Sequence, residues 1–187
     1  MDGQINPMSE MDDTPLLIGW HEWVSLPLLG VKAIKAKVDT GAKTSCLHAF
    51  NIEEFKIKKQ RWVRFEVHPL QNNDTLSIPC EAQVVDYRQV TNSGGQSELR
   101  YVIKTTIDLH RKRRWDIELT LTNRDSLSFR MLLGREAMKQ GLLVDSRHSC
   151  LLGRLSRKKV YKRYGLIIDN LKPSPLLPSD TLVKKVT

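Results

Sequence analysis

The sequence has few cysteines and few aromatic residues, and each shortage argues against a class of protein. The three cysteines, Cys46, Cys80 and Cys150, form an odd number without a short paired spacing. This pattern argues against a disulfide framework and a thiolate zinc site, so we interpret the cysteines as reduced and mostly buried. Aromatic residues make up 6% of the 187 residues, but hydrophobic residues reach 40%, which suffices for one core in one domain.

The sequence also lacks a long hydrophobic run and a recognisable secretory signal. No apolar stretch approaches the roughly 18 to 20 residues that cross a bilayer, so we expect no membrane partner. The first residues are polar and acidic, without the basic start and apolar middle of a signal peptide. We expect residues 1–14 to be a disordered leader and the protein to be cytoplasmic.

Motifs for metals and nucleotides are missing as well. His21-Glu22 is not followed by a histidine four positions after His21, where Ser25 stands, so a helical zinc pair is unavailable. The other histidines are scattered singly, and no glycine-rich phosphate loop ends in Lys-Ser or Lys-Thr. We therefore expect no metal site and no cofactor.

The pattern that is present is that of β-strands. Apolar and polar residues alternate in several segments, as they do in half-buried strands. Polar turns separate these segments, which predicts an all-β barrel or sandwich. The segments are 34–38, 63–68, 101–109 and 115–122, and the plainest turn is 92–96.

The end of the domain is marked by a short helix and a change in composition. Residues 135–140, followed by Gly141, have the pattern of a helix with a glycine cap. We expect a strand to resume at Leu142 and to reach Leu152. The β domain is expected to span residues 15–153, and residues 154–187 are expected to form a basic, proline-containing tail.

Most of the net charge of +9 lies in that tail, which carries nine basic against two acidic residues. A second basic cluster, residues 111–114, is expected at a hairpin tip. Such clusters attract nucleic acid or acidic peptides, although they can also serve only solubility. Only Tyr161 and Tyr164 interleave with the basic residues of the tail, so support for base stacking is limited. Nucleic-acid or ribosome binding through the tail is one possible function.

The most informative stretch places one carboxylate where a strand gives way to a tight turn. Ile34, Ala36 and Val38 alternate with lysines, and the strand then runs into Asp39-Thr40-Gly41. A glycine there permits a sharp turn and the close approach of another chain. Asp-Thr-Gly alone is usually a turn in which the aspartate accepts backbone N–H bonds. Its position after an apolar strand makes Asp39 a candidate catalytic carboxylate.

Several separated blocks resemble a known family in their order and spacing. The blocks are residues 19–27, 34–45, 48–49, 132–135 and 144–146. They resemble the retropepsin-like aspartic peptidases, and more closely the small bacterial proteins called RimB-like or ATP-dependent zinc proteases. The resemblance implies a retropepsin-like closed β-barrel, with one short helix near the C-terminal end of the barrel, and aspartic endopeptidase activity on a peptide or protein.

An aspartic peptidase needs two carboxylates that share one proton. This chain has one Asp-Thr-Gly, so the second carboxylate must come from a second copy, and we expect a homodimer. Asp39 would activate water, Thr40 would lock the two loops together through its hydroxyl, and Gly41 would leave room for the substrate backbone. In this family the Gly134 strand crosses behind the catalytic loop.

Ala42, Lys43, Thr44 and Arg135 are the expected substrate-binding residues. Viral retropepsins typically have acidic residues after Asp-Thr-Gly-Ala, whereas this chain has Lys43-Thr44. A lysine at the cleft wall favours an acidic substrate and cannot be the acidic partner of Arg135. We therefore predict a preference for peptides rich in Glu or Asp. The turn at residues 92–96 is a candidate flap over the cleft, with an ordinary hairpin as the alternative.

A non-catalytic function is the main alternative. The resemblance associates the chain with RimK-like ATP-grasp ligases, which add glutamate to a ribosomal protein. In that case the domain would be a regulatory or binding partner of such a ligase, and Asp39 would be only structural. The zinc and ATP in the family's other name have no support in the residues.

Overall fold

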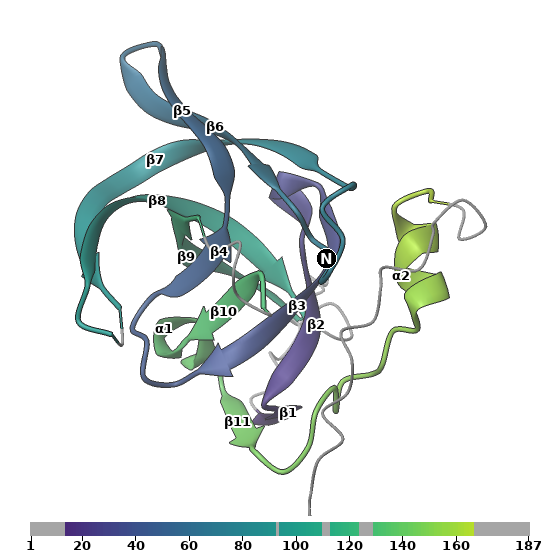
Figure 1. Ribbon diagram of the computed structural model, residues 1–187. Coiled ribbons are helices and arrows are strands. Elements are labelled where there is room, and N and C mark those ends of the chain that lie inside the picture. Colours follow the sequence, from purple (N-terminus) through teal and green to yellow (C-terminus); the bar gives the residue numbers. More distant parts are fainter. Residues whose placement is uncertain (1–13, 93, 110–112, 124–128, 167–187) are drawn as a thin grey trace, which may run out of the picture. The chain divides into compact units, whose positions relative to one another are not determined.

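The computed structural model describes residues 14–92, 94–109, 113–123 and 129–166, and strands dominate them (Figure 1). The expected leader lies almost entirely outside the described residues. The strands are β1 (Leu16–Gly19), β2 (His21–Leu26), β3 (Val31–Asp39), β4 (Ser45–His48), β5 (Phe50–Ile57), β6 (Gln60–Val67), β7 (Ile78–Thr91), β8 (Ser97–Asp108), β9 (Arg114–Thr122), β10 (Met131–Gly134) and β11 (Leu142–Asp145). The helices are the 3-10 helix η1 (Pro27–Leu29) and the α-helices α1 (Arg135–Met138) and α2 (Arg157–Arg163).

The sheet topology is that of a strongly curled sheet. Nine strands follow one another in the order β2-β3-β10-β4-β9-β8-β7-β6-β5, and β2 also pairs with β8 through Ser25 and Asp108. This extra pairing brings the sheet round into a ring of β2, β3, β10, β4, β9 and β8, as Figure 1 shows. The prediction of an all-β fold with one short helix late in the domain is confirmed.

Two further features complete the topology. β1 and β11 form a separate two-stranded parallel sheet, with Leu16 opposite Leu142. By its internal contacts the chain divides into two compact units, residues 1–154 and 155–187, and α2 belongs to the second. No helix in the described part of the chain is long and apolar enough to span a membrane.

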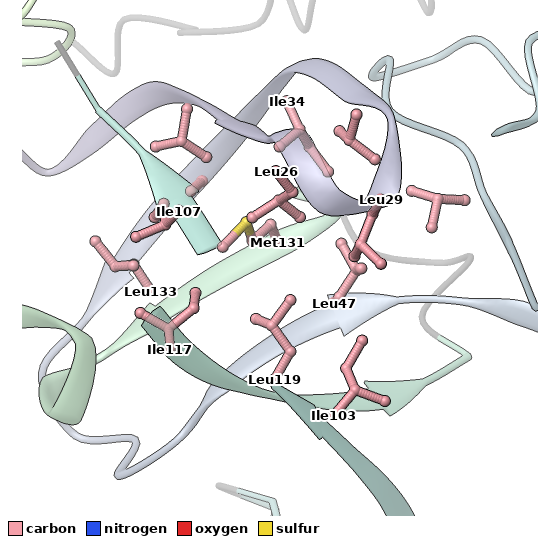
Figure 2. Packing of buried hydrophobic residues seen from close by; sticks show 14 of the residues in the cluster. Leu26, Leu29, Ile34, Leu47, Ile103, Ile107, Ile117, Leu119, Met131 and Leu133 are labelled. Carbon is pink, nitrogen blue, oxygen red and sulfur yellow. The ribbon is translucent and has the colours of Figure 1, made fainter. Parts of the chain in front are cut away.

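One hydrophobic core holds the ring together. Figure 2 shows side chains from β2, β3, β4, β8, β9 and β10 pointing toward one another. Burying a Leu or Ile side chain completely contributes about 1.5–3 kcal/mol, so this cluster is the main source of stability. Its fully buried members include Leu26, Ile34, Leu47, Ile103, Ile107, Leu119 and Leu133.

The period of two in the sequence explains which residues reach this core. In β9, Ile117 and Leu119 are buried, whereas Asp116 and Glu118 between and beside them are exposed. Successive side chains of a strand point to opposite faces, so one register places all apolar residues inside. The predicted segments 63–68, 101–109 and 115–122 correspond to β6, β8 and β9.

Two predicted element ends differ from the structure. Helix α1 stops at Met138, rather than continuing to residue 140. β11 stops at Asp145, rather than reaching Leu152, because the Asp145 carboxylate accepts hydrogen bonds from the backbone N–H and guanidinium of Arg147 and pairs with His148. These partners hold the pKa of Asp145 below its usual range and close a turn at the strand end.

Helix α2 is an element that the sequence analysis did not identify. It lies in the segment expected to be a basic tail, and the Ser156 hydroxyl caps it by accepting a hydrogen bond from the Lys159 backbone N–H at 3.3 Å. Serine is among the preferred residues at this position because it satisfies one of the unpaired N–H groups of the first turn. Residues 167–187 lie outside the described residues.

A buried carboxylate ties the chain beyond β11 to β2. Glu22 is 1% exposed, and its two oxygens accept hydrogen bonds from the backbone N–H groups of Gly19 and Leu151 at 2.7 Å and of Leu152 at 3.3 Å. Hydrogen bonds to an ionised group are stronger than neutral ones. Glu22 therefore adds to the backbone hydrogen bonds that join this segment to the start of β2, from Trp20 to His148 and from Cys150 to His21, both at 2.9 Å.

We expect Glu22→Gln to lower the free energy of unfolding by about 2–3 kcal/mol, because the amide keeps one acceptor and turns N–H groups toward the backbone donors. Urea unfolding measures the effect. Glu81→Gln is the control, because its ion pair with Arg64 is exposed and should cost only about 0.5 kcal/mol. Equal losses in the two variants would contradict this role of Glu22.

Candidate active site

Asp39 lies at the end of β3, where the chain turns. The side chain is half-buried, and Oδ1 accepts hydrogen bonds from the backbone N–H groups of Gly41 at 3.1 Å and Ala42 at 3.2 Å. Within the described residues, Oδ2 accepts no hydrogen bond. The turn that the sequence suggests is therefore present, and it holds the carboxylate in one orientation with one oxygen available.

The junction between β10 and α1 clamps the loop that follows Asp39. The backbone N–H of Arg135 donates to the carbonyl of Ala42 at 2.9 Å, and that of Glu136 donates to the carbonyl of Lys43 at 3.1 Å. The Arg135 guanidinium adds a bond to the carbonyl of Gly41 at 2.9 Å. Arg135 thus contacts the backbone of the loop, and this contact takes the place of an acidic side-chain partner.

Gly134 makes this clamp possible. It lies opposite Asp39 in the parallel β3–β10 pair, and its backbone N–H donates to the buried Ser45 hydroxyl at 3.0 Å. A Cβ atom on Gly134 would lie 2.6 Å from the Thr44 carbonyl carbon and 2.8 Å from the Ser45 nitrogen. Only a residue without a side chain permits this approach, as expected for the strand that crosses behind the loop.

A groove of about 640 Å³ opens beside Asp39. The loop forms one wall, and the hairpin of β7 and β8 forms another through its residues 88–92. The turn at 92–96 closes this hairpin, so the candidate flap lies at the groove that contains Asp39. The lining residues are Asp39, Gly41, Ala42, Lys43, Thr44, Cys46, Arg88, Gln89, Val90, Thr91, Asn92, Arg100, Thr120 and Leu132.

The structure thus brings together five of the seven residues proposed for the site. Thr40 is exposed and does not line the groove, and Arg135 lies behind the loop. Whether Ala42, Lys43 and Thr44 contact a substrate stays a prediction, as do the catalytic roles.

Two arginines of the groove were missed by the sequence analysis. Arg88 and Arg100 face each other across the β7–β8 ladder, and both line the groove. Together with Lys43 they give the groove three basic side chains, against the single carboxylate of Asp39. Cross-strand pairing could have placed the two arginines on one face, but no sequence signal shows which face covers the groove.

Each arginine is held by its own set of contacts. Arg88 donates to the Thr44 hydroxyl at 3.2 Å and to the Glu118 carboxylate at 2.8 Å, which links the hairpin to the loop. The Arg100 side chain is only 9% exposed, and it pairs with Glu98 and donates to the Cys46 sulfur at 3.6 Å. A guanidinium that is nearly buried interacts more strongly with an anion than one in water does.

Basic side chains beside the loop lower the pKa of one neighbouring carboxyl group, that of Glu136. Lys139 forms a hydrogen bond with Glu136 and holds the pKa of this carboxyl below its usual range, and Lys43 and Arg135 contribute through their charges. Basic side chains therefore lie on both partners of the clamp: Lys43 on the loop, and Arg135 and Lys139 at the start and the end of α1.

The metal suggested by the name zinc protease does not fit the residues present. Within the described part of the chain, no group of three or more His, Cys, Asp or Glu side chains could hold a metal ion. Structural and catalytic zinc sites need at least three such ligands.

Comparisons with known proteins agree with this geometry. The ring-like sheet, and an Asp-Thr-Gly loop held by the junction that follows Gly134 at the end of β10, define a retropepsin-like protein. The chain matches the family described as RimB-like, "Retropepsin-like aspartic endopeptidase RimB", over residues 17–153, and it belongs to that family.

Relatives and a solved structure extend the comparison. A Shewanella pealeana protein named "Probable alpha-L-glutamate ligase" is 50% identical over 156 residues, which cover 83% of this chain and 34% of that protein. A Desulfotalea psychrophila protein of the same name is 51% identical over 148 residues, or 79% of this chain and 32% of that protein. The chain therefore spans about a third of the length of these relatives. A crystal structure of a Legionella pneumophila protein of unknown function is 28% identical, has a TM-score of 0.61, and is matched over 73% of this chain and 98% of its own.

Proposed function

We propose that the protein is an aspartic endopeptidase that acts as a homodimer. The observation that carries this proposal is the position of Asp39, which the loop orients at the edge of a groove between the loop and a hairpin. A groove of about 640 Å³ is large enough for several residues of an extended peptide. Membership of the RimB-like family supports the same reaction.

The reaction would require two copies of the chain. If two Asp39 carboxylates face each other across a two-fold axis, repulsion between like charges raises the free energy of ionising both, so they share one proton. The ionised carboxylate takes a proton from water, and the protonated one polarises the scissile carbonyl. Because the two groups titrate as a unit, activity should depend on pH with a bell-shaped profile. The exposed Thr40 would join the two loops through its hydroxyl.

The homodimer is tested by diluting the protein. Below the dissociation constant of the dimer, cleavage per chain should fall in proportion to protein concentration, because each monomer holds half of the carboxylate pair. Sedimentation velocity at the same concentrations reports the fraction of dimer. Full cleavage per chain in samples that sediment as monomers would overturn the proposal.

The charge of the groove supports acidic peptides as substrates. Lys43, Arg88 and Arg100 line it. Glu118 and Asp86 pair with Arg88 and Glu98 pairs with Arg100, so Lys43 is the basic lining residue without an ion-pair partner among the described residues. An extended chain rich in Glu or Asp would place negative charge beside these groups while its backbone passes Asp39. Burial of Arg100 strengthens such a contact, because water screens it less.

We expect Lys43→Glu to lower the cleavage rate of a Glu-rich peptide about tenfold relative to a neutral peptide, because a nearby charge is reversed. The ratio of kcat/KM for the two peptides is the measurement. Lys32→Glu provides the matched charge reversal, because Lys32 is exposed and does not line the groove. The acidic preference would be wrong if Lys43→Glu left the ratio at its original value.

A second candidate function is favoured by the names of the relatives. Proteins named "Probable alpha-L-glutamate ligase" carry a region about half identical to this chain within a much longer protein. We infer that the domain works alongside a RimK-like ligase, either as a peptidase acting on glutamylated protein or as its non-catalytic partner. The non-catalytic function predicts that Asp39→Asn leaves ligase binding and stimulation unchanged.

A further inference from the structure

The hairpin of β5 and β6 extends beyond the rest of the sheet. β6 pairs with β7 only from Trp62 onward, so residues 56–61, which we call the tip, pair only with each other. Figure 1 shows this hairpin projecting from the curled sheet. The tip therefore has no strand pairing with β7.

The tip carries four basic residues and no acidic one. Arg61 is engaged, because it forms two hydrogen bonds with the Glu54 carboxylate at 2.8 and 2.7 Å. Lys56, Lys58 and Lys59 are exposed and form no ion pair with other described residues. The turn residues Lys58 and Lys59 therefore carry two positive charges without an ion-pair partner among the described residues, whereas Lys56 acts on the nearby Glu54 carboxyl group.

The backbone of the turn makes these lysines unusual. Lys58 and Lys59 have φ angles of 45° and 69°, and they are the two central residues between the paired Ile57 and Gln60. Such a turn favours Asn-Gly, because both central residues are left-handed. Two lysines occupy it against this preference, which indicates that their charge has a function.

Aromatic residues lie directly below the tip. Phe55 and Trp62 are partners across the strands, and both are half-buried on the same face of the hairpin. The Arg64 guanidinium lies over the Phe55 ring at 5.2 Å. A flat aromatic surface beside positive charge is what bases and phosphates of a single strand require.

The other face of the hairpin is anchored. The Arg61 guanidinium lies 5.5 Å from the Tyr87 ring and 5.9 Å from the Tyr101 ring, and the Tyr101 hydroxyl donates to Glu54 at 3.2 Å. These contacts fix the hairpin on β7 and β8. These contacts lie on one face of a supported hairpin, whereas the half-buried Phe55 and Trp62 lie on the opposite face and the turn lysines Lys58 and Lys59 are exposed.

We propose that this hairpin is an RNA-binding arm. Lys58 and Lys59 at the turn contact phosphates of single-stranded RNA, and bases stack on the Phe55 and Trp62 face. A single strand fits better than a duplex, because stacking needs unpaired bases. The tip is largely polar, which does not suit insertion into a membrane. The residues of the arm do not line the groove at Asp39.

The full-length protein and a fluorescent 20-nucleotide oligouridine test the proposal by anisotropy. Lys58→Asn/Lys59→Gly removes two charges and supplies the residues that the turn prefers, so the fold should become no less stable to urea. We expect RNA affinity to fall at least tenfold, and the slope of log affinity against log salt to fall by about 1.4. Phe55→Leu should weaken binding about fivefold with the slope unchanged.

Matched removal of charge elsewhere is the control. Lys32→Asn/Lys104→Gln removes the same charge from exposed strand positions and should change RNA affinity less than twofold. The arm is refuted if the wild-type protein does not bind oligouridine, or if Lys58→Asn/Lys59→Gly binds it as the control does. Binding of a 20-base-pair RNA duplex as tight as or tighter than that of oligouridine would also refute it. So would binding to phosphatidylserine vesicles by a protein that does not bind the RNA.

Discussion

Replacing Asp39 with Asn should reduce peptide cleavage by about a thousandfold or more at every pH from 4 to 8. The amide keeps the shape of the carboxylate and can still accept hydrogen bonds from Gly41 and Ala42, so the loop should persist. It cannot share or take a proton, and general acid–base catalysis supplies about 10²- to 10⁴-fold of a rate. Cleavage of a mixed peptide library that includes oligoglutamate peptides measures the effect.

The control for this substitution is Asp116→Asn, which removes an exposed carboxylate that does not line the groove. It should retain full cleavage. Unchanged cleavage in Asp39→Asn would mean that another group is the catalyst. Absence of cleavage by folded wild-type dimers on all peptides would instead favour the non-catalytic partner of a ligase.

Gly134→Ala should destabilise the domain by about 3 kcal/mol and abolish cleavage in the fraction that folds. The added Cβ would lie 2.6 Å from backbone atoms of Thr44, and backbone cannot move aside as a flexible side chain can. Separation of β10 from the loop would weaken the bonds from Arg135 and Glu136 that hold the loop beside Asp39. Thermal unfolding and kcat measure the two effects.

Gly95→Ala at the hairpin turn is the comparison for the Gly134 variant. Gly95 has a φ of 82° and no neighbour within 4 Å of an added Cβ, so only the left-handed backbone is penalised, by about 1–2 kcal/mol. A Gly134 variant as stable and active as the wild type would show that close approach of β10 is not required.

Most of the fold could be predicted from the alternation of apolar and polar residues along the strands. Alternation in 115–122 identified β9, because its apolar face is buried in the core; on the other face Asp116 and Glu118 are exposed, whereas Thr120 and Thr122 are buried. The end of β11 was not predictable by this means, because side-chain bonds from Arg147 and His148 to Asp145 end the strand. Helix α2 was missed because its composition was interpreted as that of a solvated tail.

The candidate site was predictable only where it is local in sequence. Residues 39–44 are adjacent in sequence, so a single motif located them, and all but Thr40 line one wall of the groove. Arg88 and Arg100 reach the groove through the β7–β8 ladder, and Ser45 meets Gly134 through strand order. Such contacts depend on which strands pair across long distances in the sequence. The local pattern of residues does not show this pairing.

The central claim is that each active site combines one Asp39 from each of two subunits. The most direct test mixes wild-type and Asp39→Asn chains in varied ratios, refolds them together and measures cleavage at constant total protein. The account predicts that activity follows the square of the wild-type fraction, because a mixed dimer holds only one ionisable Asp39. Activity that falls in direct proportion to the wild-type fraction would contradict the account, since each subunit would then act alone.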